Sequence, residues 1–264
     1  MAEALCPVVL VTGASRGLGK GIALALAQLG ADLVLNARDE ARLSEVAKAV
    51  EEQGAQVALV AGDIGNPDTA RRMVTTALER FGHLDAVVNN AGIIRPIAPI
   101  AQADADEWMT NWRTNVLGPV MLVKEALPLL RRRQGKVINI SSGAAVRPFP
   151  GWGAYCSAKA ALNHFTAVLA AEEPEITAIA FRPGIVDTDM QEDIRTYGVQ
   201  GMPPEWHRRF IRYKEEGRLQ PPEKIGRMVA FLALDAPREW SGRFLTYYEE
   251  PLRSWLEARG IAVE

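Results

Sequence analysis

Short apolar runs alternate with longer amphipathic segments along most of the chain. Residues 8–11 form a continuous apolar run, typical of a strand buried on both faces, and residues 18–30 have a helical spacing that ends at a glycine. The same alternation predicts strands at 32–35, 56–60, 86–89, 136–140, 177–181 and 244–247, and helices at 40–53, 69–81, 104–130 and from about 153. Because strand and helix alternate regularly, we expect an α/β fold: a doubly wound parallel sheet of about seven strands with helices on both faces.

Two segments depart from this alternation. Residues 187–219 show no strand pattern, and Trp206, Phe210 and Tyr213 fit one helical face there. A long excursion at the carboxyl end of a parallel sheet is typical of a lid or binding segment. Residues 251–259 have the spacing of a small amphipathic tail helix. Since no repeat or low-complexity linker divides the chain, we expect residues 1–264 to form one domain with a substrate lid at about 187–219 and a C-terminal tail helix.

Composition excludes several classes of protein. The 264 residues are 48% hydrophobic and 23% charged with a formal net charge of -2, which indicates a globular protein without the basic surface that nucleic acid or an anionic membrane requires. The chain has no apolar stretch of about 18 residues and no secretory signal, so we expect a cytosolic location. We expect Cys6 and Cys156 to be free thiols, His207 to be exposed beside basic neighbours, and no metal site, because no cluster has metal-ligand spacing.

A glycine-rich turn, T-G-A-S-R-G-L-G at residues 12–19, separates the first strand from the first helix. The first glycine permits a tight bend, the next lets backbone amides approach a phosphate, and the last lets helix and strand pack closely. The positive end of the helix then faces an anion. A simple glycine-rich loop is the alternative, but a strand before and a helix after favour a nucleotide site. The residues expected to hold the nucleotide here are Gly13, Ser15, Arg16, Gly17, Leu18 and Gly19.

The exit of the second strand indicates which nucleotide binds. An NAD site normally has an acid about 20 residues after the glycines, whereas here Ala37 ends the strand and Arg38 follows. Because Arg38 and Arg16 can pair with a 2′-phosphate, the sequence predicts NADP(H). The alternative is two exposed arginines, with Asp39 as the N-cap of the next helix.

Polar and small residues follow the later strands. Asp63, after the third strand, is expected either to accept a hydrogen bond from an adenine amino group or to cap a turn. Residues 90–92, after the fourth strand, would form a surface against a flat ligand. Asn115 lies near the middle of the helix expected at 104–130, which we expect to kink around Gly118 and Pro119. The neutral interpretation of Asn115 is a side chain that bonds locally or to solvent.

Tyr155 and Lys159 form a candidate proton-transfer pair. Four residues apart on a helix, they share one face about one turn from each other. A cation about 4 Å from a phenol, at an effective dielectric near 20, stabilises the phenolate by on the order of 4 kcal/mol. This would lower the phenol pKa by about two to three pH units, towards the range that general acid catalysis needs. The pair alone is a weak motif, and a helix with one aromatic residue and one solvated lysine is the alternative. The fifth strand ends at Ser141 and Ser142.

Together these residues resemble the short-chain dehydrogenase/reductase family from about residue 8 to residue 248. The match rests on the glycine turn, the Asn-Asn-Ala-Gly block at 89–92, Asn115, a serine 13 residues before Tyr155, the Tyr155/Lys159 pair, and Pro183-Gly184 followed by Thr188. The resemblance implies a single-domain Rossmann-type fold. It implies that Ser142 holds the substrate carbonyl, Tyr155 protonates it, Lys159 binds the nicotinamide ribose and lowers the phenol pKa, and Asn115 supports a water relay. It further implies cofactor contacts from Asn90, Ala91, Gly92, Tyr155, Lys159, Pro183, Gly184, Ile185 and Thr188.

Residues 152–156, 172–174, 183–191 and 214–219 are similar to the sepiapterin reductase and benzil reductase branch, whose NADPH-dependent members reduce ketones and vicinal dicarbonyls. The branch implies the same activity here on a small-molecule carbonyl substrate. A non-catalytic NADP(H)-binding regulatory protein and an NAD(P)-dependent secondary-alcohol dehydrogenase are the alternatives. Phe149, Trp152, Met190 and Trp206 would wall a pocket for an aromatic or bulky substrate, or else belong to the core. Glu249 stands where sepiapterin reductases have a pterin-anchoring aspartate, and family members usually form homodimers or homotetramers through the helices expected here at 104–130 and 153–172.

Overall fold

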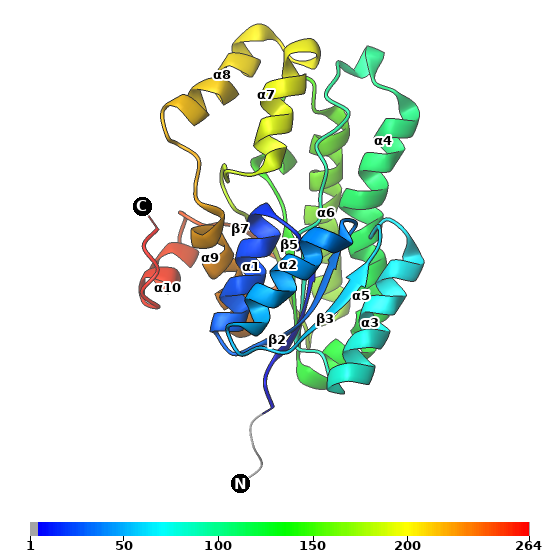
Figure 1. Ribbon diagram of the computed structural model, residues 1–264. Coiled ribbons are helices and arrows are strands. Elements are labelled where there is room, and N and C mark those ends of the chain that lie inside the picture. The colour runs from blue at the N-terminus through cyan, green and yellow to red at the C-terminus, as the bar shows by residue number, and fades with distance from the viewer. Residues whose placement is uncertain (1–4, 264) are drawn as a thin grey trace.

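The computed structural model describes residues 5–263 and confirms the expected α/β architecture (Figure 1). Within this part of the chain, seven strands form one sheet in the order β3-β2-β1-β4-β5-β6-β7, and all neighbouring strands are parallel. The strands are β1 (Val8–Thr12), β2 (Asp32–Ala37), β3 (Val57–Ala61), β4 (Ala86–Asn89), β5 (Lys136–Ile140), β6 (Thr177–Arg182) and β7 (Phe244–Thr246). The α-helices are α1 (Gly17–Gln28), α2 (Glu40–Glu51), α3 (Pro67–Phe81), α4 (Ala105–Trp112), α5 (Gly118–Arg133), α6 (Gly153–Glu172), α7 (Asp189–Gly201), α8 (Pro204–Glu215), α9 (Pro222–Asp235) and α10 (Leu252–Glu257).

Successive residues of the central strand β1 face opposite helical layers. Val9 and Val11 belong to a buried cluster with side chains of α1, α2, α9 and α10, whereas Val8 and Leu10 belong to a second cluster with α3, α5 and α6. Because side chains alternate along a strand, a continuous apolar run is needed to cover both faces. The apolar runs read from the sequence therefore specify a sheet between two layers of helices.

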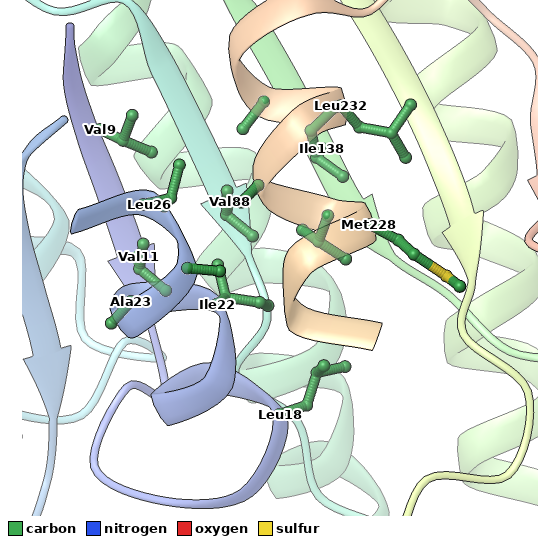
Figure 2. Close-up of a cluster of buried hydrophobic side chains, with 14 of the residues drawn as sticks. Val9, Val11, Leu18, Ile22, Ala23, Leu26, Val88, Ile138, Met228 and Leu232 are labelled. Carbon is green, nitrogen blue, oxygen red and sulfur yellow. The ribbon is translucent and has the colours of Figure 1, made fainter. Parts of the chain in front are cut away.

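Helices α1 and α9 cross in direct backbone contact over one face of the sheet (Figure 2). A Cβ on Gly226 of α9 would lie 2.4 Å from the carbonyl carbon of Gly21, and a Cβ on Gly21 would lie 2.6 Å from the carbonyl oxygen of Pro222. This close approach places Ile22, Met228 and the strand residues beneath them in one dry cluster. It also fixes α1, whose N-terminus borders the cleft described below.

The helix expected at 104–130 is continuous but not uniform. Residues Arg113–Leu117 form a wide π-helical turn between α4 and α5. The irregularity thus lies immediately before Gly118 and Pro119, where a kink was expected, and it contains Asn115. π-Helical turns inside α-helices are frequent at functional sites.

The segment without strand pattern forms two helices, α7 and α8, at the carboxyl end of the sheet (Figure 1). A Cβ on Gly201, at the end of α7, would lie 1.8 Å from the carbonyl oxygen of Ile97, so this helix presses on the loop after β4. His207 was expected to be exposed, but it is buried and its Nε2 donates to the carbonyl oxygen of Arg195 (2.7 Å). The reason is the packing of α8 on α7, which places His207 on the covered face. Cys6 and Cys156 are free thiols, as expected. Across residues 5–263, no helix combines the length and apolar character that spanning a membrane would require.

Candidate active site

A cleft of about 1090 Å³ opens at the carboxyl ends of the strands, where the strand order reverses between β1 and β4. Open α/β sheets bind their ligands at this point. The ends of β1 to β6 line the cleft, and α7 and α8 contribute side chains from the other side. Pockets for drug-sized ligands reach about 1,000 Å³, so this cleft has room for a large cofactor together with a small substrate.

The predicted glycine turn forms one end of the cleft. Gly13 has a φ of +65°, and a Cβ on Gly19 would lie 2.1 Å from the Gly13 carbonyl oxygen, so neither position has room for a side chain. Asn90 ties the turn to the end of β4, because its Nδ2 donates to the carbonyl oxygens of Thr12 (3.0 Å) and Gly13 (3.2 Å). No side chain caps the N-terminus of α1, a helix of 12 residues. Bare glycine backbone and uncapped amides together fit the phosphates of a dinucleotide.

Arginines stand beside the end of β2. Arg38 and Arg42 both line the cleft and are exposed. Asp39 is occupied by the helix: its Oδ1 accepts from the Arg42 backbone N–H (3.1 Å), and its Oδ2 lies 3.5 Å from Arg42 Nε. Asp39 is therefore the N-cap of α2, as the alternative interpretation held. Arg16 is paired with Asp189 at the start of α7, so it bridges the two walls of the cleft.

The sequence analysis missed Arg42. Its signal was its position in the first turn of the helix that follows Arg38, since the start of that helix borders the same cleft as the end of β2. Asp63 lines the cleft with its Oδ1 accepting from the Gly65 backbone N–H (2.8 Å), which makes it a turn cap. The other predicted cofactor residues also line the cleft, namely Gly13, Ser15, Arg16, Gly17, Leu18, Gly19, Asn90, Ala91, Gly92, Pro183, Gly184, Ile185 and Thr188.

Ser142, Tyr155 and Lys159 meet at the middle of the cleft, although they come from separate elements. Ser142 follows β5, and its hydroxyl hydrogen-bonds the Tyr155 phenol and accepts from the Ala144 backbone N–H (3.1 Å). Tyr155 and Lys159 lie in the first two turns of α6 and are 6% and 4% exposed. All three line the cleft, so the spacing in the sequence identified a real cluster.

Burial decides the protonation of this cluster. It raises the pKa of Tyr155 to about 12, which outweighs the lowering by the hydrogen bond with Ser142. It also lowers the pKa of Lys159 to about 8. The expected lowering of the Tyr155 pKa by Lys159 is therefore wrong. The Lys159 Nζ lies 5.6 Å from the centre of the Tyr155 ring and donates to the Ile140 carbonyl oxygen (2.8 Å), and loss of water disfavours both charged forms.

Asn115 lies behind the cluster on the π-helical turn and is fully buried. Its Nδ2 donates to the Ile93 carbonyl oxygen (2.8 Å) and to Asn111 Oδ1 (2.8 Å), and its Oδ1 accepts from the Ile93 backbone N–H (3.3 Å). Gly92 fits between Asn115 and Lys159, because a Cβ there would lie 2.8 Å from Asn115 Oδ1 and 3.7 Å from Lys159 Nζ. Asn115 thus fixes the loop after β4 against the buried lysine, a longer-range role than the local bonding considered above.

The far end of the cleft is largely aromatic. Phe149, Trp152 and Met190 line it as expected, with the Phe149 and Trp152 rings stacked at 4.8 Å between centroids. Phe210 and Tyr213 of α8 also line it, and the sequence analysis had identified them only as part of a helical face. Trp206 and Glu249 do not line it. Trp206 lies one turn before Phe210 on α8 and packs edge-on against Phe149, with 5.5 Å between the ring centroids. Glu249 is exposed in the turn after β7, where its backbone N–H donates to the Thr246 carbonyl oxygen (3.0 Å).

Comparison with known proteins agrees with this geometry. The pattern of the short chain dehydrogenase family matches residues 7–197. An uncharacterized oxidoreductase of Schizosaccharomyces pombe is 38% identical over 94% of this chain and 98% of its own length. A benzil reductase ((S)-benzoin forming) of Saccharomyces cerevisiae is 35% identical over 93% of this chain and 97% of its own length. The crystal structure of a short chain dehydrogenase/reductase from Saccharomyces cerevisiae superimposes with a TM-score of 0.90 at 38% identity, covering 94% of this chain and 98% of that one.

Proposed function

The chain belongs to the short-chain dehydrogenase/reductase family, a family of oxidoreductases with nicotinamide cofactors, and we propose that it is an NADPH-dependent carbonyl reductase acting on a ketone or a vicinal dicarbonyl. The observation that carries the proposal is the meeting of Ser142, Tyr155 and Lys159 in the same cleft as the glycine turn. The similarity to a benzil reductase supports the choice of carbonyl substrate.

The residues present fit a dinucleotide phosphate. The glycine turn and the uncapped N-terminus of α1 would hold the pyrophosphate, and Arg38 and Arg42 would hold a 2′-phosphate. Asp39, the acid that lines the cleft directly after β2, is occupied as a helix cap rather than available to a ribose 2′-hydroxyl, which supports NADP(H) over NAD(H). When bound, NADPH supplies the hydride that adds to the carbonyl carbon.

The chain's own groups supply the proton and stabilise charge. Tyr155, with a pKa raised to about 12 by burial, is protonated at neutral pH and is therefore able to donate its proton to the carbonyl oxygen as the C=O π bond breaks. Ser142 would orient that oxygen by a hydrogen bond. The Lys159 ammonium, buried close to the phenol ring, would stabilise the negative charge that passes from alkoxide to phenolate. Asn115, which fixes the loop beside Lys159, would support the return of a proton to Tyr155 through water.

The aromatic end would take the rest of the substrate. Phe149, Trp152, Met190, Phe210 and Tyr213 offer apolar contact to an aromatic or bulky group. We include α7 and α8 in the proposal as a lid, because they contribute the cleft wall opposite the strand ends.

The test is an activity assay on the purified protein with NADPH or NADH and a panel of aromatic ketones and diketones. The quantity monitored is the loss of the nicotinamide absorbance. We expect turnover with NADPH, and a fall of about 10²- to 10⁴-fold in kcat for Tyr155→Phe. Tyr197→Phe is the matched control, because Tyr197 is 46% exposed on α7 and does not line the cleft. Arg38→Ala should raise the KM for NADPH about 10-fold or more and leave that for NADH unchanged.

Three results would overturn the proposal. Silence across the panel, together with tight NADPH binding, would favour a regulatory binding protein. A lower KM for NAD than for NADP with secondary alcohols would favour a dehydrogenase. Full activity of Tyr155→Phe would remove the phenol from the mechanism.

A further inference from the structure

Arg182 is a cleft residue that the proposed reaction does not use. It ends β6, where it pairs in register with Thr246 of β7, and it is one of the residues that line the cleft. The guanidinium lies against Gly143, the residue after Ser142: a Cβ on Gly143 would be 3.0 Å from Arg182 Nε and 3.1 Å from both Cζ and Nη2. A fixed positive charge therefore stands one residue beyond the serine that faces Tyr155.

This guanidinium differs from the other arginines of the cleft. Of the arginines in residues 5–263 that line it, Arg182 alone is partly buried, whereas the others are exposed. Arg16, Arg42 and Arg95 are paired with Asp189, Asp39 and Asp193. The Arg182 guanidinium has no hydrogen bond or ion pair within the described part of the chain. Its neighbours are the Tyr248 ring, with Cζ 5.7 Å from the ring centre, and the Tyr247 phenol, whose pKa burial raises and the Arg182 charge lowers in part.

An unpaired, partly buried cation is costly unless a ligand satisfies it. The acids of the cleft lie on other elements. Asp39 and Asp63 act as caps near the glycine turn, Asp189 and Asp193 are paired with arginines, and Asp106 and Glu107 begin α4. Glu249, next to Tyr248 in the sequence, is exposed and does not line the cleft. The donors of Arg182 are thus available to an acceptor that enters the cleft.

We propose that Arg182 determines substrate specificity by binding an acceptor oxygen on the carbon next to the reacting carbonyl. The proposal rests on the proposed function. Ser142 and Tyr155 would fix the reacting oxygen, and the guanidinium lies against Gly143, the residue next to that serine, so it would be within reach of a substituent on the adjacent carbon. A carboxylate matches the planar fork best because it accepts two hydrogen bonds, and a second carbonyl accepts one. The preferred substrates are therefore 2-oxo acids and vicinal dicarbonyls, in that order, over simple ketones.

Three substrates that share a phenyl ring test this order: phenylglyoxylate, 1-phenyl-1,2-propanedione and acetophenone, each assayed with NADPH. Because the three differ in intrinsic reactivity, the informative quantity is the ratio of kcat/KM between variant and wild type for each one. We expect Arg182→Met to lose about 10- to 100-fold on phenylglyoxylate, about 2- to 10-fold on the dione and less than 3-fold on acetophenone. Arg182→Lys should recover part of the activity on phenylglyoxylate, because it keeps the charge and loses the fork. Arg243→Met is the control, since Arg243 is exposed before β7 and does not line the cleft.

A binding measurement without turnover accompanies the kinetics. Phenylglyoxylate, added with NADP⁺, should raise the melting temperature of the wild type more than that of Arg182→Met. An equal loss on all three substrates, or an equal thermal response of the two proteins, would make Arg182 a structural residue and overturn the inference. If Arg182→Met fails to fold, the same kcat/KM ratios measured for Arg182→Lys test the inference in its place. A wild type that binds phenylglyoxylate through Arg182 but reduces none of the three would refute the proposed function, and with it the role in specificity, and would leave Arg182 only as an anion-binding residue.

Discussion

Lys159 is a buried cation, and its removal should change how stability depends on pH. Its side chain is 4% exposed, and burial lowers its pKa from 10.5 to about 8. Its nearest acceptor is the Ile140 carbonyl oxygen at 2.8 Å, with no carboxylate paired to it among residues 5–263. Lys159→Met keeps an apolar chain of similar length and removes the titrating group.

The direction in which stability changes with pH depends on how many protons the folded and unfolded states bind. Below pH 8 the lysine is protonated both folded and unfolded, so the wild type bears the full cost of burying the charge. Between about pH 8 and 10.5 the unfolded chain binds more protons than the native protein, and stability therefore rises with pH. The interval from 10.5 to about 8 corresponds to about 3 kcal/mol at 1.36 kcal/mol per pH unit, of which about 2 kcal/mol is recovered between pH 7 and pH 9.5. Loss of the hydrogen bond to Ile140 shifts the variant by an amount that does not depend on pH.

The measurement is the melting temperature of both proteins from pH 7 to pH 9.5 at fixed protein concentration. Relative to Lys159→Met, the wild type should gain about 4 to 8 °C over this range, since 1 kcal/mol moves the midpoint of a domain this large by about 2 to 4 °C. Tyr155, whose pKa is raised to about 12, is present in both proteins and titrates above this range. Lys20→Met, on an exposed position of α1, is the control. A difference between wild type and Lys159→Met that stays constant with pH would refute the reasoning.

Two further predictions concern packing. Gly226→Ala should destabilise the protein by about 3 kcal/mol or more in urea unfolding, because the new Cβ would lie 2.4 Å from the backbone of Gly21 and neither helix backbone can turn aside. Gly54→Ala, at a φ of +88° with nothing within 4 Å of the new Cβ, should cost only about 1 kcal/mol, and equal effects would contradict the close contact of α1 and α9. Phe210→Ala should raise the KM for aromatic substrates about 10-fold, whereas Trp206→Ala should change kcat/KM less than 3-fold, because only Phe210 lines the cleft. The reverse order in steady-state kinetics would return Trp206 to the substrate pocket.

The sheet and the glycine turn could be predicted from the sequence because their signals are local. Residues 8–11 had to be apolar to face both helical layers, and Gly13 and Gly19 had to be glycines because the turn leaves no space for a Cβ. The spacing of Tyr155 and Lys159 placed them on one face of α6, and the position of Ser142 at the end of β5 brought it to them. Each of these inferences needs only neighbours in sequence and the parallel order of strands.

The rest depended on how distant segments pack. The sequence pattern put Trp206, Phe210 and Tyr213 on one helical face, but the way α8 rests against Phe149 decided that Phe210 and Tyr213 reach the cleft and Trp206 does not. The spacing of Tyr155 and Lys159 suggested that the lysine charge would lower the pKa of the phenol. Burial by the surrounding elements has the larger effect and raises that pKa instead. Arg182 had no motif at all. Its position is set by contact with Gly143, a residue 39 positions earlier whose missing side chain leaves room for the guanidinium. Solvent exclusion and contacts between distant segments arise only in the folded chain, so no local sequence pattern could predict them.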